Sequence, residues 1–286
     1  MSIRRGRAAL QSSTVATGRP LGRAVGMAAT AVLVAAGCSS GSSNGDHPDT
    51  TSLLPPGAEA LVGRYAHYDV VAYQDKSMKT LVISTGFADL EVRDGKLWNV
   101  QRFCHADMGS DQKIDIAISD TATRAIVPVD TPVEVSLAGD KLRVLRPATP
   151  TAIGIKLNDP AHEVLPADPK DPRIFDADGD GHPGVTSTVK VGPGLEGEIY
   201  LARREIFSYD VTQTSSDRLE GSITDNSEQL VIGASNPIFA TSAQWKQVPL
   251  ADRNPVIWQR VDSSWDCDRL AAERATLFPS NPKADW

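Results

Sequence analysis

The stretch TLVISTGFADLEVRDGKLWNVQRF, residues 80–103, decides the fold class. Polar and hydrophobic residues alternate along it, and β-branched and aromatic residues recur, which is the pattern of half-buried β-strands. Asp94-Gly95 stands between two such runs, and this dipeptide is typical of a two-residue hairpin turn. We therefore expect strands over residues 80–84, 87–93 and 96–103, with the last two joined as an antiparallel hairpin.

Short strand-like runs continue on both sides of this stretch. Each is rich in β-branched or aromatic residues, and turn residues separate it from the next. Residues 147–184 interrupt the series, because Pro, Asp and Gly are frequent there. We expect further strands over residues 63–73, 114–119, 124–127, 133–137, 141–145, 185–191, 198–201, 205–211, 219–224 and 229–232.

One segment, residues 267–277, has a helical pattern. Its apolar residues occur at helical spacings, and Asp266 stands where an N-cap is expected. A chain of about a dozen antiparallel strands must hide its sheet edges, usually by closing into a barrel or by packing as two sheets. The predicted fold is therefore all-β, a mainly antiparallel barrel-like or sandwich domain over residues 58–286, with one short C-terminal helix.

Composition and charge limit the classes of partner. The chain has 286 residues, of which 41% are hydrophobic and 23% charged, as in soluble globular proteins. The first 37 residues hold five of the 29 Lys and Arg and none of the 36 Asp and Glu, so the remainder has 24 basic and 36 acidic residues and a net charge of −12. Phosphate backbones repel such a surface. Nucleic acid is therefore not expected as a partner, and charge does not explain attachment to anionic lipids.

The N-terminal residues follow the order of a secretory signal. A basic region ends at Arg23, an apolar run covers residues 24–36, and small residues follow. The apolar run is too short to cross a bilayer. It ends in Val34-Ala35-Ala36-Gly37-Cys38, which resembles the lipobox of bacterial lipoprotein precursors, with Ala35 where Leu is commonest. The resemblance implies a signal peptide over residues 1–37 and lipid on Cys38.

Lipidation of Cys38 would anchor the mature protein. Two or three acyl chains hold a protein on a membrane firmly, because each buried methylene contributes about 0.8 kcal/mol. Residues 38–57 are rich in Ser, Gly, Asp and Pro and are expected to form a flexible spacer. We therefore expect an extracytoplasmic protein, lipid-anchored to the bacterial cell membrane or outer membrane. The alternative is that Cys38 is an ordinary buried cysteine or a disulfide partner.

Cys104 and Cys267 form an even pair once Cys38 is lipidated. Outside the cytoplasm such a pair favours a disulfide. This bridge would tie the first half of the chain to its end, which favours a single domain. Two alternatives stay open. The cysteines are buried separately as free thiols, or Cys104 is a catalytic nucleophile beside His105, although sequence neighbours rarely present a base to a nucleophile.

Residues 176–184, with the sequence DADGDGHPG, form the motif with the clearest chemistry. Three carboxylates alternate with small residues, and Gly181 permits the sharp turn that directs them to one point. Hard oxygen ligands in this number suit Ca²⁺. The segment resembles the DxDxDG loop of EF-hands, dockerins, thrombospondin type 3 repeats and the FG-GAP repeats of β-propellers. The resemblance implies a structural Ca²⁺ held by the side chains of Asp176, Asp178 and Asp180 and the backbone carbonyl of His182.

The segment departs from these families at two ligand positions. An EF-hand has Glu at loop position twelve, where this chain has Ser187, and the repeat families usually have Asp at position nine, where it has Gly184. Asp168, Asp171 and Glu196 are the nearest acidic candidates for the missing ligands, and water is the other source. The alternative is a solvated turn that uses Asp and Gly for their backbone conformations alone.

No other motif indicates catalysis. The five histidines are scattered singly, and the chain has no H-E-x-x-H and no phosphate-binding glycine loop. We therefore expect a non-catalytic lipoprotein that binds a ligand or an envelope partner protein through its β domain. The alternative is a glycan-directed extracellular hydrolase, which requires two carboxylates roughly 5 to 10 Å apart in a cleft.

Overall fold

The computed structural model describes residues 54–75, 78–112, 114–240 and 245–286, which belong to one compact unit. The strands are β1 (Gly63–Gln74), β2 (Lys79–Arg93), β3 (Lys96–Ser110), β4 (Ile114–Ile118), β5 (Thr131–Pro132), β6 (Glu134–Ala138), β7 (Lys141–Arg146), β8 (Thr151–Ile153), β9 (Val185–Val191), β10 (Leu195–Glu205), β11 (Phe207–Ser215), β12 (Arg218–Asp225), β13 (Glu228–Ala234), β14 (Lys246–Gln247) and β15 (Pro255–Val261). The helices are α1 (Asp120–Arg124) and α2 (Cys267–Leu277), with 3₁₀ turns η1 (Ala58–Leu61), η2 (Pro237–Phe239) and η3 (Ala251–Arg253).

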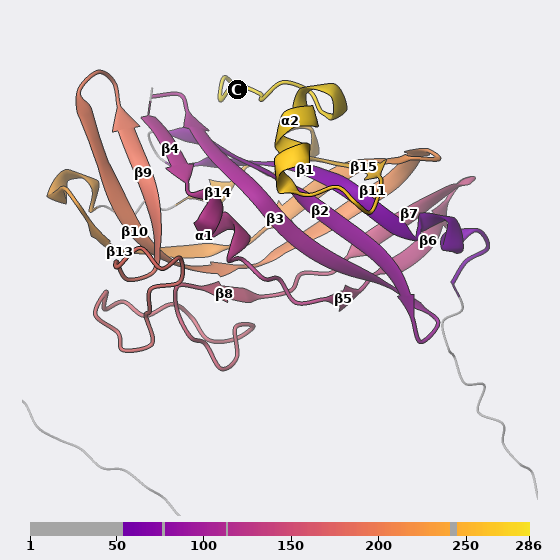
Figure 1. The fold of residues 1–286 in the computed structure, drawn as a ribbon, viewed down its shortest axis with the longest axis horizontal. Coiled ribbons are helices and arrows are strands. Elements are labelled where there is room, and N and C mark those ends of the chain that lie inside the picture. Colours follow the sequence, from indigo (N-terminus) through magenta and orange to yellow (C-terminus); the bar gives the residue numbers. More distant parts are fainter. Residues whose placement is uncertain (1–53, 76–77, 113, 241–244) are drawn as a thin grey trace, which may run out of the picture. The chain divides into compact units, whose positions relative to one another are not determined.

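The strands join in one antiparallel sheet that curls into a half-barrel (Figure 1). The order along the sheet is β13-β10-β9-β4-β3-β2-β1-β15-β12-β11-β7-β6, and β5, β8 and β14 pair at its sides. Within the described residues β13 pairs only with β10, and β6 only with β7, so the sheet does not close on itself. The all-β, mainly antiparallel class with a short C-terminal helix is confirmed, and the architecture lies between the barrel and the sandwich that the sequence left open.

The β2–β3 hairpin forms around the predicted turn. Asp94 and Gly95 both have positive φ, 50° and 72°, as a two-residue turn that matches the twist of the strands requires. Residues 80–84 and 87–93 are not separate strands, because β2 runs unbroken from Lys79 to Arg93. The pairing with β3 shifts between Thr85 and Gly86. A Cβ on Gly86 would lie 2.0 Å from the Arg102 carbonyl oxygen, so this glycine serves close strand approach and does not end a strand.

Two further differences from the sequence prediction concern short or Pro-flanked elements. Residues 124–127 do not form a strand. Ser119 caps the short helix α1 instead, its Oγ accepting a hydrogen bond from the Ala122 N–H at 3.0 Å. The central strand β15 was missed, because it follows a polar loop and begins at Pro255, a residue that strands tolerate only at their ends or edges.

Strand β1 is buried on both faces. Its Tyr65, Val71 and Tyr73 belong to the core inside the half-barrel, whereas Tyr68 and Val70 belong to a second core on the outer face. This explains why residues 63–73 are hydrophobic almost throughout and do not alternate strictly. The second core requires a covering layer, which α2 and the C-terminal segment provide (Figure 1).

Helix α2 is fixed to the outer face by packing and by a covalent bond. Leu270 is fully buried there, and Phe278 stacks on Tyr68 with ring centroids 5.3 Å apart. Cys267, the first residue of α2, is joined to Cys104 of β3 by a disulfide whose Cα atoms are 5.3 Å apart. Asp266 accepts a hydrogen bond from the Arg269 N–H at 2.8 Å, as the predicted N-cap should.

Neither described helix has the length and apolar character needed to cross a membrane. The predicted signal peptide over residues 1–37, Cys38 and spacer residues 38–53 lie outside the described residues.

Replacing both Cys104 and Cys267 by Ser should lower the free energy of unfolding by about 3 to 5 kcal/mol, because the bridge closes a long loop in the unfolded chain. The sequence separation is 163 residues. Urea unfolding followed by circular dichroism measures the difference, and wild-type protein under reducing agent is the matched control. Equal stability of the oxidised wild type and the double variant would contradict the stabilising role.

Candidate functional site

Ionisable side chains gather on the inner face of the half-barrel, near its middle. His67 and Asp69 of β1 contact each other through Nε2 and Oδ2, and the Tyr209 hydroxyl of β11 lies 3.1 Å from both atoms. All three side chains are buried. Burial, reinforced by the charge of Asp69, raises the pKa of Tyr209 well above its usual value. Tyr209 therefore stays protonated and donates to Asp69.

Arg146 of β7 is fully buried beside this group. Its guanidinium donates to the Phe207 carbonyl oxygen at 3.0 Å and to Asn99 Oδ1 at 3.1 Å, and lies 4.6 Å from the centre of the Phe207 ring. Burial lowers the pKa of Arg146. Within the described ranges no carboxylate forms an ion pair with it, so neutral acceptors and aromatic faces balance this charge.

A second group of charges follows along the inner face. Arg203 of β10 donates through Nε to Glu205 at 2.7 Å, and Asp225 of β12 accepts from the Tyr73 hydroxyl and from Ser227. Burial and the nearby charge of Glu205 raise the pKa of Asp225. We call both groups together the interior polar cluster: His67, Asp69, Tyr73, Arg146, Arg203, Glu205, Tyr209 and Asp225.

The interior polar cluster borders a cavity of only about 50 Å³. Ligand pockets usually measure about 300 to 1,000 Å³, so this space is too small for a sugar or peptide. Its carboxylates are engaged with Tyr, Arg, Ser and His side chains of the same chain. The cluster therefore ties β1, β7, β10, β11 and β12 together across the interior.

One end of the half-barrel contains a larger space, which we call the apolar cavity, of about 420 Å³. Its walls come from β4, β9, β10 and β13, which lie at the left in Figure 1, and from η2 and Trp245. Trp245 also stacks on Tyr73 with centroids 5.8 Å apart, so its ring lies between the apolar cavity and the interior polar cluster. Half-buried aliphatic side chains of the strands line it: Ile114, Ile116, Val191, Leu195, Ile199 and Val231.

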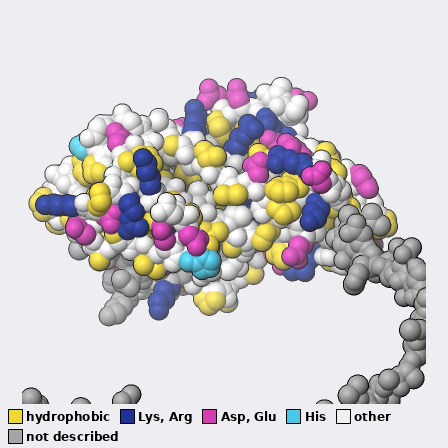
Figure 2. All heavy atoms as spheres, turned by 90° about the horizontal axis from the view of Figure 1, so that it is seen from below, with side chains coloured by type: hydrophobic (Ala, Val, Ile, Leu, Met, Phe, Trp, Pro, Cys, Tyr) yellow, Lys and Arg dark blue, Asp and Glu magenta, His cyan; other side chains and the backbone are white. Residues whose placement is uncertain are grey.

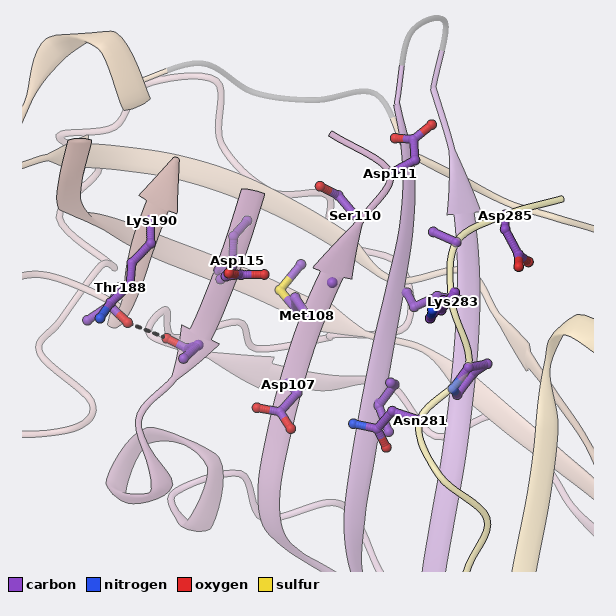
Figure 3. A pocket seen from close by; sticks show the side chains of 17 residues that line it. Asp107, Met108, Ser110, Asp111, Asp115, Thr188, Lys190, Asn281, Lys283 and Asp285 are labelled. Atoms are coloured by element: carbon purple, nitrogen blue, oxygen red, sulfur yellow. Dashed lines mark hydrogen bonds between the residues drawn. The ribbon is translucent and has the colours of Figure 1, made fainter. Parts of the chain in front are cut away.

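A groove of about 770 Å³ lies on the outer face, where residues 281–285 run beside the sheet (Figure 3). Leu81 and Ile83 contribute apolar surface to it. Its polar residues carry both signs of charge, with Asp107, Asp111, Asp115, Asp285, Lys190 and Lys283 around it. The chemistry of this groove is thus mixed, in contrast to the apolar cavity.

The predicted calcium motif forms an exposed loop between β8 and β9. Carboxylate oxygens of Asp176, Asp178 and Asp180 lie within 4.8 Å of one another. The loop is closed at its base, because the Ala177 N–H donates to the Gly184 carbonyl and the Gly184 N–H to the Phe175 carbonyl, at 2.9 and 2.8 Å. The three predicted side-chain ligands are therefore brought together.

The individual carboxylates of this loop differ in environment. Asp176 accepts hydrogen bonds from the N–H groups of Gly179 and Gly181, and these bonds lower its pKa. Burial, and then the charges of Asp180 and Asp176, raise the pKa of Asp178. Asp178 Oδ2 accepts from the Thr186 N–H at 3.0 Å, whereas its Oδ1 is buried without a hydrogen-bond partner.

The other expected ligands are not gathered around these three carboxylates. Asp171 forms an ion pair with Arg173, Asp168 accepts from the Lys170 N–H, and Glu196 lies 3.6 Å from Lys190. The imidazole of His182 stacks on the Tyr200 ring of β10 at 4.3 Å. This contact involves only the imidazole ring, so the predicted ligand, the backbone carbonyl of His182, takes no part in it.

His105 belongs to β3 and lies between two carboxylates. Its Nε2 is 3.0 Å from Asp107 and its Nδ1 is 2.7 Å from Asp120, on a partly exposed surface. Hydrogen bonding to Asp107 is the main cause that raises its pKa to about 9. Cys104 is held in the disulfide, so the alternative of a Cys104–His105 nucleophile pair is wrong.

Neither the interior polar cluster nor the apolar cavity follows from the residue patterns in the sequence. The available signal for the cluster was His67 and Asp69 inside an otherwise hydrophobic strand.

The exterior carries both signs of charge interspersed with hydrophobic residues on the face in Figure 2. No protein-family model, curated protein or solved structure matches this chain.

The contribution of His105 to the free energy of unfolding should depend on pH. Because the folded pKa of about 9 exceeds the unfolded value of about 6.5, the contribution of His105 to stability is complete below about pH 6.5 and is lost as pH rises through about 9. Its side chain is 43% exposed, so screening limits this contribution to below about 1 kcal/mol. Asp107→Asn should lower the His105 pKa in an NMR titration.

Asp159→Asn is the matched control, because Asp159 pairs with the exposed His162 instead. This variant should leave the titration of His105 unchanged. A wild-type His105 that titrates near pH 6.5 would contradict the ion pair.

Proposed function

We propose that this chain is a lipid-anchored extracytoplasmic lipoprotein whose β domain binds a ligand and does not catalyse its conversion. The observation that carries the binding function is the apolar cavity, because about 420 Å³ lies in the range of ligand pockets. Aliphatic side chains around it are only half buried, and a ligand that covers them gains about 25 cal/mol per Å² of apolar surface.

The extracytoplasmic location is supported by two independent features. The lipobox-like segment that ends at Cys38 provides an address and an anchor. The Cys104–Cys267 disulfide fits the same location, because disulfides persist in oxidising compartments and are rare in the cytosol.

The interior polar cluster supports a binding role over a catalytic one. Its acids are engaged with partners in the same chain, and the adjoining cavity of about 50 Å³ has no room for a glycan. A glycosidase needs its two carboxylates on either side of a bound sugar. The cluster is instead suited to fixing the spacing of the strands that shape the apolar cavity.

The acidic loop fits a structural Ca²⁺ as part of this proposal. Asp176, Asp178 and Asp180 would supply side-chain oxygens and His182 a backbone oxygen. The unpartnered Oδ1 of Asp178 is the observation that favours an ion, because a buried carboxylate oxygen without a partner is costly. A divalent cation would offset both this cost and the mutual repulsion of the three carboxylates.

The loop is well placed to stabilise the connection over residues 147–184. Gly184 at its base lies so close to β10 that a Cβ there would be 2.3 Å from the Leu201 carbonyl oxygen. Thr186, the second residue of β9, donates to Asp178. An ion in the loop would therefore hold the connection against β9 and β10, two walls of the apolar cavity.

Calcium at about 10 mM should raise the midpoint of thermal unfolding, because a ligand at about 100 times its Kd adds roughly 2.7 kcal/mol of stability. Asp178→Asn should abolish this increase. Asp168→Asn, in the same connection but outside the three-carboxylate group, should retain it. An unchanged wild-type midpoint between calcium and chelator would indicate that the loop is only a turn.

Cys38→Ser should move the exported protein from the detergent phase to the aqueous phase in detergent partitioning, because no thiol remains to carry acyl chains. The Cys104→Ser/Cys267→Ser double variant should still partition into detergent. A Cys38→Ser protein that stays in the detergent phase would contradict lipid anchoring at this residue.

A further inference from the structure

Three of the four strands that line the apolar cavity have no free backbone edge. Strand β4 pairs with β3 and β9, β9 with β4 and β10, and β10 with β9 and β13. Their N–H and C=O groups are therefore used in sheet ladders on both sides. A peptide that binds by strand addition needs an open edge, and within the described residues only β13 offers one here, because it pairs with β10 alone.

The polar groups at the cavity are few. Asp75 is its one ionisable lining residue within the described residues, and its carboxylate accepts a hydrogen bond from the Met78 N–H at 3.0 Å. The amide oxygen of Gln229 accepts from Arg203 at 3.2 Å and is thus already used. Among the described residues the lining therefore supplies no cation for a carboxylate or phosphate inside the cavity.

A ligand that matches these walls is flexible, elongated and without hydrogen-bonding groups in the part that enters. We infer that the apolar cavity takes the acyl chain of a lipid or fatty acid, with the polar head group left outside. This inference rests on the proposed binding function and names its ligand class. It predicts recognition of the chain and tolerance of different head groups.

The curl of the sheet explains why affinity should depend on the length of the acyl chain. Ile114 and Ile116 of β4 and Val191 of β9 line one side, and Trp245 closes the space toward the interior polar cluster. Apolar atoms thus surround the occupant from more than one direction, and each additional methylene is transferred from water into this environment. Such a transfer tightens binding by about fourfold per methylene until the cavity is full.

The experiment is a calorimetric titration of the protein with single-chain fatty acids of roughly 8 to 16 carbons, below their micellar concentrations. Affinity should rise about fourfold per methylene and then level off. A fatty acid and a lysophospholipid with the same chain should differ in affinity by less than about tenfold. Affinity that is independent of chain length would overturn the inference.

Leu195→Trp is designed to fill the cavity, and Glu196→Trp is its matched control. The two residues are adjacent at the start of β10, but Leu195 lines the cavity whereas the exposed Glu196 pairs with Lys190 outside it. Leu195→Trp should weaken binding of the longer chains at least about tenfold, and Glu196→Trp should not. Circular dichroism verifies that both variants fold. Equal affinities of the two variants would overturn the assignment to this cavity.

A naphthalene-sulfonate dye distinguishes failure of the ligand class from failure of the binding function. Fatty acids should displace the dye from wild-type protein, and Leu195→Trp should reduce its fluorescence enhancement. Dye that binds in a Leu195-dependent way but is not displaced by fatty acids would overturn the acyl-chain inference and leave a binding cavity. Absence of binding by both dye and fatty acids would overturn the proposed binding function as well. Displacement of the dye by an apolar peptide alone would replace the lipid by a protein partner.

Discussion

The burial of β1 on both faces is the constraint on which the rest of the molecule depends. Its inner side chains pack inside the half-barrel and its outer ones require a cover. Helix α2 provides this cover, and the Cys104–Cys267 bridge holds the helix on the sheet. The last elements of the chain thus complete the packing of β1, which is its first strand. One hydrophobic run near the N-terminus therefore determines where the C-terminal segment must lie.

The interior of the half-barrel divides into a charged middle and an apolar end. In the middle, Arg146 and the Asp69–Tyr209 pair are satisfied by neighbours at fixed distances, which gives the strands a specific register. At the apolar end, aliphatic and aromatic side chains make up most of the described lining, and Asp75 and Gln229 are its polar residues. Trp245 and Tyr73 meet where these two regions join. This division separates the part of the interior that specifies the structure from the part in which we propose that a ligand binds.

The sequence predicts the strand-rich class, the β2–β3 turn, the α2 cap and the meeting of Asp176, Asp178 and Asp180, because each follows from local residue patterns. The outcomes it misses depend on contacts distant in sequence. Gly86 reads as a strand break, although the backbone of Arg102 is what requires a glycine there. The short Ser119-capped helix has too few residues for a periodic signal. The cavities arise from the curl of the sheet, which no alternation pattern encodes.

The junction before β1 has a mechanical consequence. Arg260 of β15 donates to the carbonyl oxygens of Ala60 and Val62 at 2.6 and 2.8 Å, and β1 is bonded to β2 along its whole length. If the domain is anchored at Cys38, as we propose, tension on the chain would reach the sheet at the N-terminal end of β1. A pull directed along β1 would load the hydrogen bonds to β2 and β15 in shear, so that these bonds would share the force.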